Sequence, residues 1–596
     1  MAGAHMTTLT AQQKDAVECQ SNLLLTACPG SGKTRTLTAK LITEIEGVRG
    51  SPKRICCITY TNSAVQEIEG RAEQQLQQGD DRFFYAATIH AFCFNEIIRP
   101  FGWLLPNFRG IVKILTRESA DFEEIADHAA RQIGLFSLTS RDYEAFEALA
   151  VDSKGKVVGL AAENEPIKLA ARHFWDRCAV LGYTDFGMLI YNAYRLIRDH
   201  PKIAKSICAR YAWFLIDEFQ DTTELQIEIL KLLYATGRSR FFAVGDLAQS
   251  IYSFTGARPE LVEPFAASIG ARTDLSLTGN FRSSQKIVAH AERLFPRRPA
   301  MTAEGSNKLF PLEPELIRGM SAFQAITENF LPKLAINDIP LGEATILAKD
   351  WASLFSLTRQ LREFGTPVVG PGARPYRRSR LFATLAEQLC GLITDPQPEN
   401  YRQLDRALFH AVQDATGTAR FDIFGYAGRL VIVRLLRAAK RQAENFGGAM
   451  QWLDAMSMAT GEILKEAEFV DAKQSGLFPA SAHEMKRDME RQHVDIANLS
   501  IEDLGLFASP TKALRLSTIH YSKGREYSAV AIIGLRQGNF PHFRSTDVEA
   551  EKRLFYVAVT RAEKLLMYVA EQDSWESPPS QFLGPAGVAM FGAQRS

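Results

Sequence analysis

The sequence predicts an α/β protein with two parallel-sheet cores, each interrupted by a mainly helical insertion. Two stretches alternate short apolar strands with amphipathic helices, which is the pattern of a parallel sheet. Each stretch is broken by a segment of longer amphipathic or charged helical patterns with few β-rich runs. We therefore divide the chain into a first core (6–98 and 184–279), its insertion (99–183), a second core (280–373 and 509–575), its insertion (374–508) and a short tail (576–596).

The elements of the two cores follow in order along the chain. In the first core we expect a helix over 10–18 and strands over 23–27, 54–59, 211–216, 240–244 and 275–277. In the second core we expect strands over 344–348, 514–518, 529–534 and 565–570. Ligands of open α/β sheets bind at the carboxyl ends of the strands, so the residues that follow these runs are the candidates for a site.

Composition excludes several classes of protein. The chain has 596 residues, of which 46% are hydrophobic and 23% charged, as in ordinary globular proteins of several domains. The net charge of +1 means that any nucleic-acid surface must be a local patch. Eight cysteines without a C-x-x-C pair argue against a zinc or iron–sulfur site. The absence of a long apolar run predicts a cytoplasmic protein without membrane contact.

A phosphate-binding loop follows the strand over 23–27. It consists of Ala27, Cys28, Pro29, Gly30, Ser31, Gly32, Lys33 and Thr34. Glycines let backbone N–H groups surround anionic oxygens, Lys33 can reach the outer phosphates, and the Thr34 hydroxyl can bind Mg²⁺. Ala27 stands where the usual pattern has its first glycine, and a small residue still fits that turn. A glycine-rich loop without a ligand is the alternative.

Paired carboxylates follow the strand over 211–216. Hydrolysis of a phosphoanhydride needs a metal anchor and a group that orients or deprotonates water. We expect Asp217 to hold the metal and Glu218 to act as the base. Alone, such a segment is a solvated acidic loop about as often as a site. Together with the phosphate-binding loop it predicts hydrolysis of a nucleoside triphosphate.

Ordered motifs extend this pattern and carry a family resemblance. The segments are 9–13, 59–62, 87–92, 244–252, 280–283, 518–527 and 556–562. They resemble the Q motif, motif Ia and its following segment, and motifs III to VI of the UvrD/Rep/PcrA group of superfamily 1 helicases. The resemblance implies two RecA-like motor domains, 1A and 2A, with insertions 1B and 2B. It also implies ATP and Mg²⁺ as cofactors, and 3′–5′ movement on single-stranded DNA that unwinds duplex at single-strand/duplex junctions.

The resemblance assigns roles around the nucleotide. Gln13 would read adenine, Arg35 and Phe281 would sandwich it, and Glu526 would contact the ribose. Gln249 would sense the γ-phosphate. Arg282 and Arg561 would be arginine fingers on the second core, which reach the phosphate when the cores close. A surface arginine is usually only solvated, but their settings, N-F-R-S and V-T-R-A, favour the catalytic role.

The resemblance also assigns a DNA surface. The residues are Tyr60, Thr61, Asn62, Thr88, His90, Phe92, Tyr252, Phe254, Thr518 and His520. Aromatic rings in loops can stack on bases without reading sequence. An aromatic in an α/β chain is more often part of the core, and of the aromatic residues named only Tyr60, Tyr252 and Phe254 match stacking sites of the family. Where the family has Trp-Arg, this chain has Phe254-Thr255, so we expect a weaker grip on single-stranded DNA there.

Other departures leave a second hypothesis open. The insertion over 374–508 is shorter than the family's 2B domain and lacks its Gly-Ile-Gly signature. The string 95–101, Asn-Glu-Ile-Ile-Arg-Pro-Phe, and the compact architecture resemble the UvrD-like subunit of Gabija anti-phage complexes, which works beside an OLD-type nuclease. The chain would then sense nucleotide or DNA ends and activate a nuclease partner. A generic phosphate-loop kinase or GTPase would leave Arg561 and the segment 518–527 unexplained.

Overall fold

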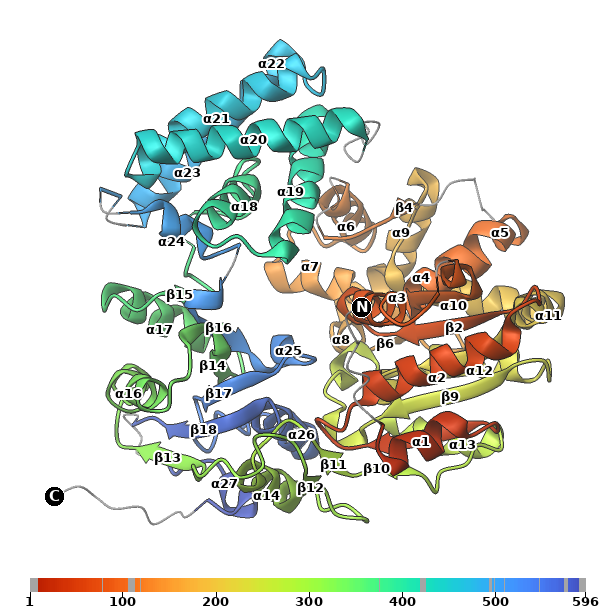
Figure 1. Cartoon of the computed structure of the whole chain (residues 1–596). Coiled ribbons are helices and arrows are strands. Elements are labelled where there is room, and N and C mark those ends of the chain that lie inside the picture. Colours follow the sequence, from red (N-terminus) through yellow and green to blue (C-terminus); the bar gives the residue numbers. More distant parts are fainter. Residues whose placement is uncertain are drawn as a thin grey trace. The chain divides into compact units, whose positions relative to one another are not determined.

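The computed structural model divides the chain into two compact units (Figure 1). The structure describes residues 9–588, except 78, 106–112, 118, 120, 375, 418–424, 493–495, 498, 509, 546 and 573–576. The first unit comprises residues up to 310 together with 547–557. The second comprises 311–546 and the residues from 558 onward.

A six-stranded parallel sheet forms the centre of the first unit. Its order is β10-β1-β9-β8-β2-β3. The strands are β1 (Leu23–Ala27), β2 (Arg54–Thr59), β3 (Phe84–Thr88), β8 (Tyr211–Ile216), β9 (Arg240–Gly245) and β10 (Ser276–Leu277). Successive side chains point to opposite faces, so in β2 Ile55 and Cys57 enter one core while Cys56 and Ile58 enter the other. Helices must therefore cover both faces, as parallel sheets require.

The helices of the first unit divide between these two faces. One face packs against α1 (Ala11–Glu18), α2 (Lys33–Val48) and α3 (Asn62–Glu73). The other packs against α10 (Phe186–Asp199), α11 (Pro201–Arg210), α12 (Glu224–Tyr234) and α13 (Val262–Ser268). Short elements follow β3 and β10: α4 (Ile89–Phe92), α5 (Arg99–Phe101), β11 (Gly279–Asn280), α14 (Gln285–Leu294) and β12 (Thr302–Ala303).

The insertion of the first unit is mainly helical, as predicted. It contains β4 (Lys113–Ile114), α6 (Phe122–Gln132), α7 (Ser140–Glu147), β5 (Ala150–Val151), β6 (Val157–Val158), α8 (Leu160–Glu163), α9 (Glu165–Leu181) and β7 (Tyr183–Thr184). Its core is separate from that of the sheet and is centred on Phe122, Phe146 and Phe174. The insertion thus buries its own apolar faces.

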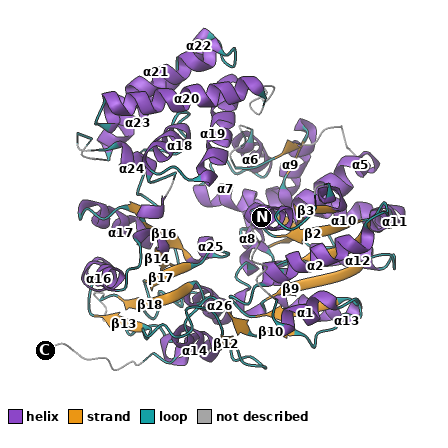
Figure 2. Ribbon diagram, in the orientation of Figure 1, coloured by secondary structure: helices purple, strands orange, loops and turns teal. Residues whose placement is uncertain are grey.

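The second unit repeats the arrangement with a sheet of order β13-β18-β17-β14-β16-β15, again parallel. The strands are β13 (Glu315–Arg318), β14 (Ala344–Ala348), β15 (Val368–Val369), β16 (Leu514–Thr518), β17 (Tyr527–Ile532) and β18 (Ala562–Ala570). The helices are α15 (Ala322–Ala325), α16 (Leu331–Ile336), α17 (Ala352–Glu363), α25 (Ile519–Ser522) and α27 (Leu583–Ala586). Between β15 and β16 the described residues form helices, with no strand among them (Figure 2).

This second insertion is a helical bundle with its own core around Trp452. Its helices are α18 (Ala383–Thr394), α19 (Pro398–Thr416), α20 (Tyr426–Asn445), α21 (Ala449–Glu466), α22 (Ala472–Ser475), α23 (Leu477–Arg491) and α24 (Ile501–Gly505). Trp452 is fully buried and its indole N–H donates to the carbonyl of Ala439 at 3.1 Å. This hydrogen bond from a buried aromatic ring of α21 to the backbone of α20 fixes how the two helices pack.

The predicted fold class is confirmed: two parallel α/β sheets each carry a helical insertion. The units nevertheless divide the chain elsewhere than the predicted cores do. Residues 280–310, which we assigned to the second core, belong to the first unit, as do 547–557. The latter segment is most of α26 (Val548–Val559), whose Tyr556 ring lies edge-on to Phe295 at 5.1 Å between centroids. None of the described helices is both long and apolar enough to cross a lipid bilayer.

Candidate nucleotide site and nucleic-acid interface

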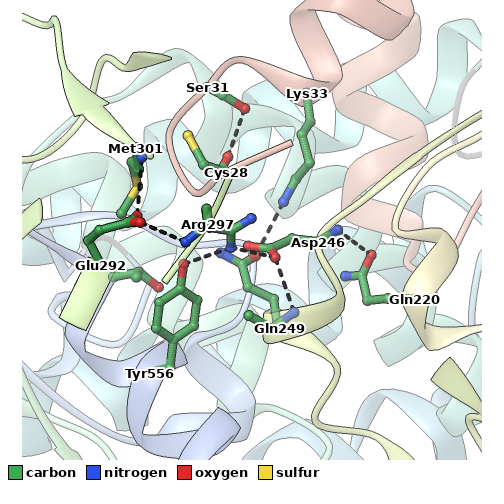
Figure 3. Close-up of polar contacts among 12 residues, drawn as sticks. Cys28, Ser31, Lys33, Gln220, Asp246, Gln249, Glu292, Arg297, Met301 and Tyr556 are labelled. Atoms are coloured by element: carbon green, nitrogen blue, oxygen red, sulfur yellow. Dashed lines mark hydrogen bonds and ion pairs between the residues drawn. The ribbon is translucent and has the colours of Figure 1, made fainter. Parts of the chain in front are cut away.

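The phosphate-binding loop joins the end of β1 to the first turn of α2. Gly30 and Gly32 have φ angles of 67° and 78°, in the left-handed region that favours glycine. The hydroxyl of Ser31 donates to the carbonyl of Cys28 at 2.7 Å and closes the turn (Figure 3). The helix then begins at Lys33 without a side-chain cap or an acidic residue in its first turn. Such a helix N-terminus favours an anion.

The segment after β10 lies directly on this loop. The N–H of Phe281 donates to the carbonyl of Gly30 at 2.9 Å. A β-carbon on Gly30 would lie 2.7 Å from that of Arg282 and 3.0 Å from Oδ1 of Asn280, so only glycine permits the approach. The prediction that Arg282 stands on the second core is therefore corrected: it belongs to the first unit, beside the loop. Local backbone pairing holds it there.

Gln13 ties α1 to the loop. Its side chain is buried, Nε2 donates to the carbonyl of Ser31 at 2.9 Å, and Oε1 accepts from the N–H of Thr10 at 3.0 Å. Lys40 of α2 fixes the other end of α1, because Nζ donates to the carbonyls of Val17 and Cys19 at 2.9 and 2.7 Å. That Gln13 reads adenine stays a prediction, as do the base contacts of Arg35 and Phe281.

Three side chains that follow β8 and β9 contact the first turn of α2. Nζ of Lys33 donates to Oε1 of Gln249 at 3.3 Å and lies 3.9 Å from a carboxylate oxygen of Glu218. The hydroxyl of Thr34 donates to Oδ2 of Asp217 at 3.5 Å. The sheet has thus brought the predicted phosphate-binding, metal-binding, base and sensor residues to one point, although they are about 200 residues apart in sequence.

The two carboxylates have distinct environments. Burial, then the negative charge of Glu218, raises the pKa of Asp217 well above its ordinary value. A cation would relieve that cost, and the oxygens of Asp217 and Thr34 suit Mg²⁺, which prefers oxygen ligands. Glu218 has φ 51° and ψ 43°, and its carboxylate accepts from Nε2 of Gln220. A left-handed non-glycine residue is strained, and such strain is typical of functional sites.

Sequence reasoning missed an arginine that lies behind the phosphate-binding loop. Arg297 follows α14, and Nη2 donates to Oδ1 of Asp246 at 2.6 Å and to the hydroxyl of Tyr556 at 2.8 Å (Figure 3). Asp246 directly follows β9, in the same loop as Gln249. No pattern singled out Arg297, because it stands 15 residues beyond Arg282 and outside every matched motif.

Two predicted nucleotide residues belong to the second unit. The side chain of Arg561 is buried, and its guanidinium donates to the carbonyl of Arg525 at 3.1 Å and the hydroxyl of Thr560 at 3.3 Å. Its own carbonyl accepts from the N–H of Tyr527 at 3.0 Å, at the start of β17. Glu526, the predicted ribose contact, is exposed beside it. The finger role of Arg561 stays a prediction.

The predicted DNA residues of the first unit lie at the carboxyl edge of its sheet. Tyr60 and Tyr252 stack on each other with centroids 4.9 Å apart and planes inclined by 20°. The hydroxyls of Thr61 and Thr88 accept backbone N–H groups and cap α3 and α4, while Asn62 is exposed. The two tyrosines form one half-buried platform, with the helix starts beside it.

Phe92 is not a DNA-binding residue, and that prediction is wrong. Its ring is fully buried and lies edge-on to Phe214 at 6.0 Å, in the core beneath the sheet. A four-residue helix, α4, turns this position inward. His90 packs edge-on against Phe186 at 5.0 Å, and burial lowers its pKa to about 4, so it is neutral near pH 7. The side chain of Phe254 lies outside what the structure describes.

The second unit carries an aromatic cluster that motif reasoning missed. Trp351 and Tyr521 are 46% and 56% exposed, with ring centroids 6.2 Å apart, and the guanidinium of Arg525 lies 4.7 Å from the Tyr521 ring. They follow the adjacent strands β14 and β16, where Thr518 and His520, the predicted DNA residues, also lie. Thr518 caps α25 with its hydroxyl. Exposed aromatic rings beside cations suit unpaired bases.

Comparison with known proteins identifies the family. The model of the UvrD/REP helicase N-terminal domain matches residues 9–269, and that of the UvrD-like helicase C-terminal domain matches residues 478–572. The chain belongs to the UvrD/REP helicase family. Together these matches span the phosphate-binding loop, both carboxylates, Gln249 and Arg561, and leave most of the second insertion unmatched.

Relatives match over nearly the whole chain. DNA helicase II of Escherichia coli (strain K12) is 26% identical over 97% of this chain and 87% of its own length. The ATP-dependent DNA helicase Rep of the same strain is 25% identical over 93% of this chain and 90% of its own length. DNA helicase II of Haemophilus influenzae is 26% identical over 91% of this chain and 81% of its own length. The UvrD/REP resemblance drawn from the motifs is thereby confirmed.

Proposed function

We propose that this protein is an ATP-dependent DNA helicase that hydrolyses ATP with Mg²⁺, moves 3′ to 5′ on single-stranded DNA and unwinds duplex at junctions. The observation that carries the proposal is the convergence of Lys33, Thr34, Asp217, Glu218 and Gln249 at the carboxyl edge of one parallel sheet. Family membership supports the DNA substrate. The polarity, the metal and a cytoplasmic location are predictions from the resemblance and the sequence.

The residues divide the hydrolysis among themselves. Lys33 and the N-terminus of α2 bind the phosphates, and Asp217 with Thr34 would hold Mg²⁺, which shields charge on the β- and γ-phosphates. Glu218 orients water and takes its proton. Gln249 contacts Lys33 and so responds to the outer phosphate. Arg282 and Arg561 would neutralise the charge that develops on the γ-phosphate, as arginine fingers do.

The DNA surface is proposed to include two aromatic platforms, one on each unit. Tyr60 and Tyr252 form the first, and Trp351 with Tyr521 forms the second. Stacking on aromatic rings tolerates any base, which suits a motor that must traverse every sequence. The net charge of +1 requires that phosphate contacts come from local cations such as Arg525.

ATP hydrolysis with and without single-stranded DNA tests the proposal. We expect DNA to stimulate the wild-type protein, Lys33→Ala to abolish nucleotide use, and Arg561→Ala to retain ATP binding but lose hydrolysis. Lys14→Ala, an exposed lysine on α1, is the matched control and should behave as wild type. A Lys33→Ala protein that hydrolyses ATP at the full rate would refute the assignment of the site.

Unwinding substrates test the direction of movement. The isolated chain should open a 3′-tailed duplex in the presence of ATP and leave a 5′-tailed duplex closed. Hydrolysis without unwinding would instead favour the second hypothesis, a subunit whose ATP cycle activates a nuclease. That hypothesis rests on the string 95–101 and the compact architecture, and it stays a prediction.

A further inference from the structure

Arg297 is a buried cation whose contacts join two parts of the ATP-binding unit. It stands three residues after α14, and its backbone N–H donates to a carboxylate oxygen of Glu292 at 2.7 Å. The side chain of Arg297 is 14% exposed and that of Asp246 only 1%. Burying both charges costs free energy unless they are paired, so the fold holds the guanidinium of Arg297 against the carboxylate of Asp246.

On one side, Arg297 fixes the loop that carries Gln249. Asp246 Oδ1 accepts from Arg297 and from the N–H of Ala248 at 3.1 Å, and its carbonyl accepts from the N–H of Gln249 at 2.8 Å. Its own N–H donates to Oε1 of Gln220 at 2.9 Å. A continuous set of hydrogen bonds therefore runs from Lys33 through Gln249 and Asp246 to Arg297 (Figure 3).

On the other side, Arg297 holds helix α26. Its Nη2 donates to the Tyr556 hydroxyl at 2.8 Å, and Tyr556 is fully buried. The ring of Tyr556 packs edge-on against Phe295, two residues before Arg297. The helix ends at Val559, and Arg561 follows two residues later. Nη2 of Arg297 thus donates hydrogen bonds to the loop that carries Gln249, the predicted γ-phosphate sensor, and to α26, which leads to the predicted arginine finger.

We propose that Arg297 is a positioning residue for ATP hydrolysis: it sets the Gln249 loop against α26, so that nucleotide sensing and finger placement act together. Arg297 touches no reacting atom in this role and works through Asp246 and Tyr556. The proposal rests on the function proposed above for Gln249 and Arg561. The competing explanation is that the Arg297–Asp246 ion pair only stabilises the fold. Loss of Arg297 would lower kcat if it positions the site, and would lower only stability if the ion pair is purely structural.

Kinetics of variants of the full chain distinguish the two. We expect Arg297→Gln to lower kcat for DNA-stimulated ATP hydrolysis at least tenfold, and Tyr556→Phe to lower it about threefold. In both variants KM for ATP should change less than threefold. Arg297→Lys, which keeps the charge beside Asp246, should recover part of kcat. Arg298→Gln removes the exposed neighbouring arginine and should match wild type. Unchanged kcat for Arg297→Gln, with lowered thermal stability alone, would overturn the proposal.

A double variant tests whether Arg297 acts through Gln249. If it does, Gln249→Ala combined with Arg297→Gln should lower kcat no further than the more severe single change. Losses that multiply would contradict the coupling. Amide hydrogen exchange gives an activity-free check: Arg297→Gln should accelerate exchange in both 244–252 and α26, and acceleration in one segment alone would also overturn it. A wild-type chain without DNA-stimulated hydrolysis would refute the proposed function instead, and exchange would still decide the coupling.

Discussion

Lys40 offers a direct measure of how the nucleotide site is held together. It lies on α2, seven residues beyond Lys33, and its side chain is fully buried. Nζ donates to Oε1 of Glu44 at 2.6 Å, as well as to the two carbonyls at the end of α1. The ammonium also lies 4.3 Å from the centroid of the Trp213 ring in β8. The ammonium of Lys40 therefore contacts α1, α2 and the sheet at once.

Lys40→Met keeps the length of the side chain and removes every polar contact. Glu44, only 10% exposed, then keeps a buried carboxylate that still accepts a hydrogen bond from Nε2 of Gln20 at 2.9 Å. Breaking a buried pair by removing one member costs about 3–5 kcal/mol, because the other charge stays buried. Lys40→Met with Glu44→Leu removes that charge as well. The double variant should then recover about half of the loss, since the two α1 carbonyls remain unpaired.

Amide hydrogen exchange of α1 and α2 is the suitable assay, because a chain of two units does not unfold in one step. Exchange in these helices should accelerate by about two to four orders of magnitude in the single variant, which corresponds to 3–5 kcal/mol. ATP affinity should fall as well, since α1 carries Gln13. A change below about 1 kcal/mol, or a double variant no more protected than the single one, would refute this reasoning.

Three further predictions concern other parts of the molecule. Burial raises the pKa of Asp185 to about 6, so the folded state holds a proton there that the unfolded state releases above about pH 4. Its contribution to stability falls as pH rises from 4 to 6 and is level above. Asp185→Asn should therefore gain up to about 3 kcal/mol relative to wild type between pH 4 and pH 7, measured by amide hydrogen exchange of α10, the helix that Asp185 caps. A constant difference between the two proteins would contradict this. Gly30→Ala combines a φ of 67° with a β-carbon 2.7 Å from that of a neighbouring arginine, whereas Gly237, with φ 66°, has no atom within 4 Å of such a carbon. ATP affinity should fall more than tenfold for Gly30→Ala and stay unchanged for Gly237→Ala; equal effects would exclude the close approach as the cause. Trp351→Ala should weaken binding of a thymidine oligonucleotide by about tenfold, with the salt dependence of binding unchanged. The control variant Trp103→Ala removes a tryptophan that is 68% exposed and should bind as wild type. An abasic oligonucleotide should bind the two variants equally well, and a loss of its affinity for Trp351→Ala would argue against stacking.

Local patterns predicted the parts of the site that depend on one strand and the turn after it. The strand 23–27 followed by Gly30 to Thr34, and the strand 211–216 followed by Asp217, appear at the predicted bounds. Short apolar runs bounded by turn residues suit a buried parallel strand, and parallel strands bring their carboxyl ends to one edge. Sequence therefore sufficed to bring Lys33, Asp217 and Gln249 together.

Long-range packing decided the rest. Tyr60 directly follows β2, whereas Phe92 comes after β3 at the end of the short helix α4, where its ring is buried against Phe214. Only the structure could show this, because the side of a short helix that faces the core depends on what packs there. Trp351 shows the reverse, since an apolar residue that sequence reasoning left unremarked is half exposed beside Tyr521.

The sequence by itself determined the family, the two sheets and the phosphate-binding chemistry, because these depend on residues close together in the chain. Tertiary structure alone decided that Arg282 lies beside Gly30 in the first unit, and that Arg297 meets both Asp246 and Tyr556. Tyr556 stands 259 residues beyond Arg297. No local pattern encodes such a pairing, because a buried polar group meets a partner so distant in sequence only once the tertiary packing has formed.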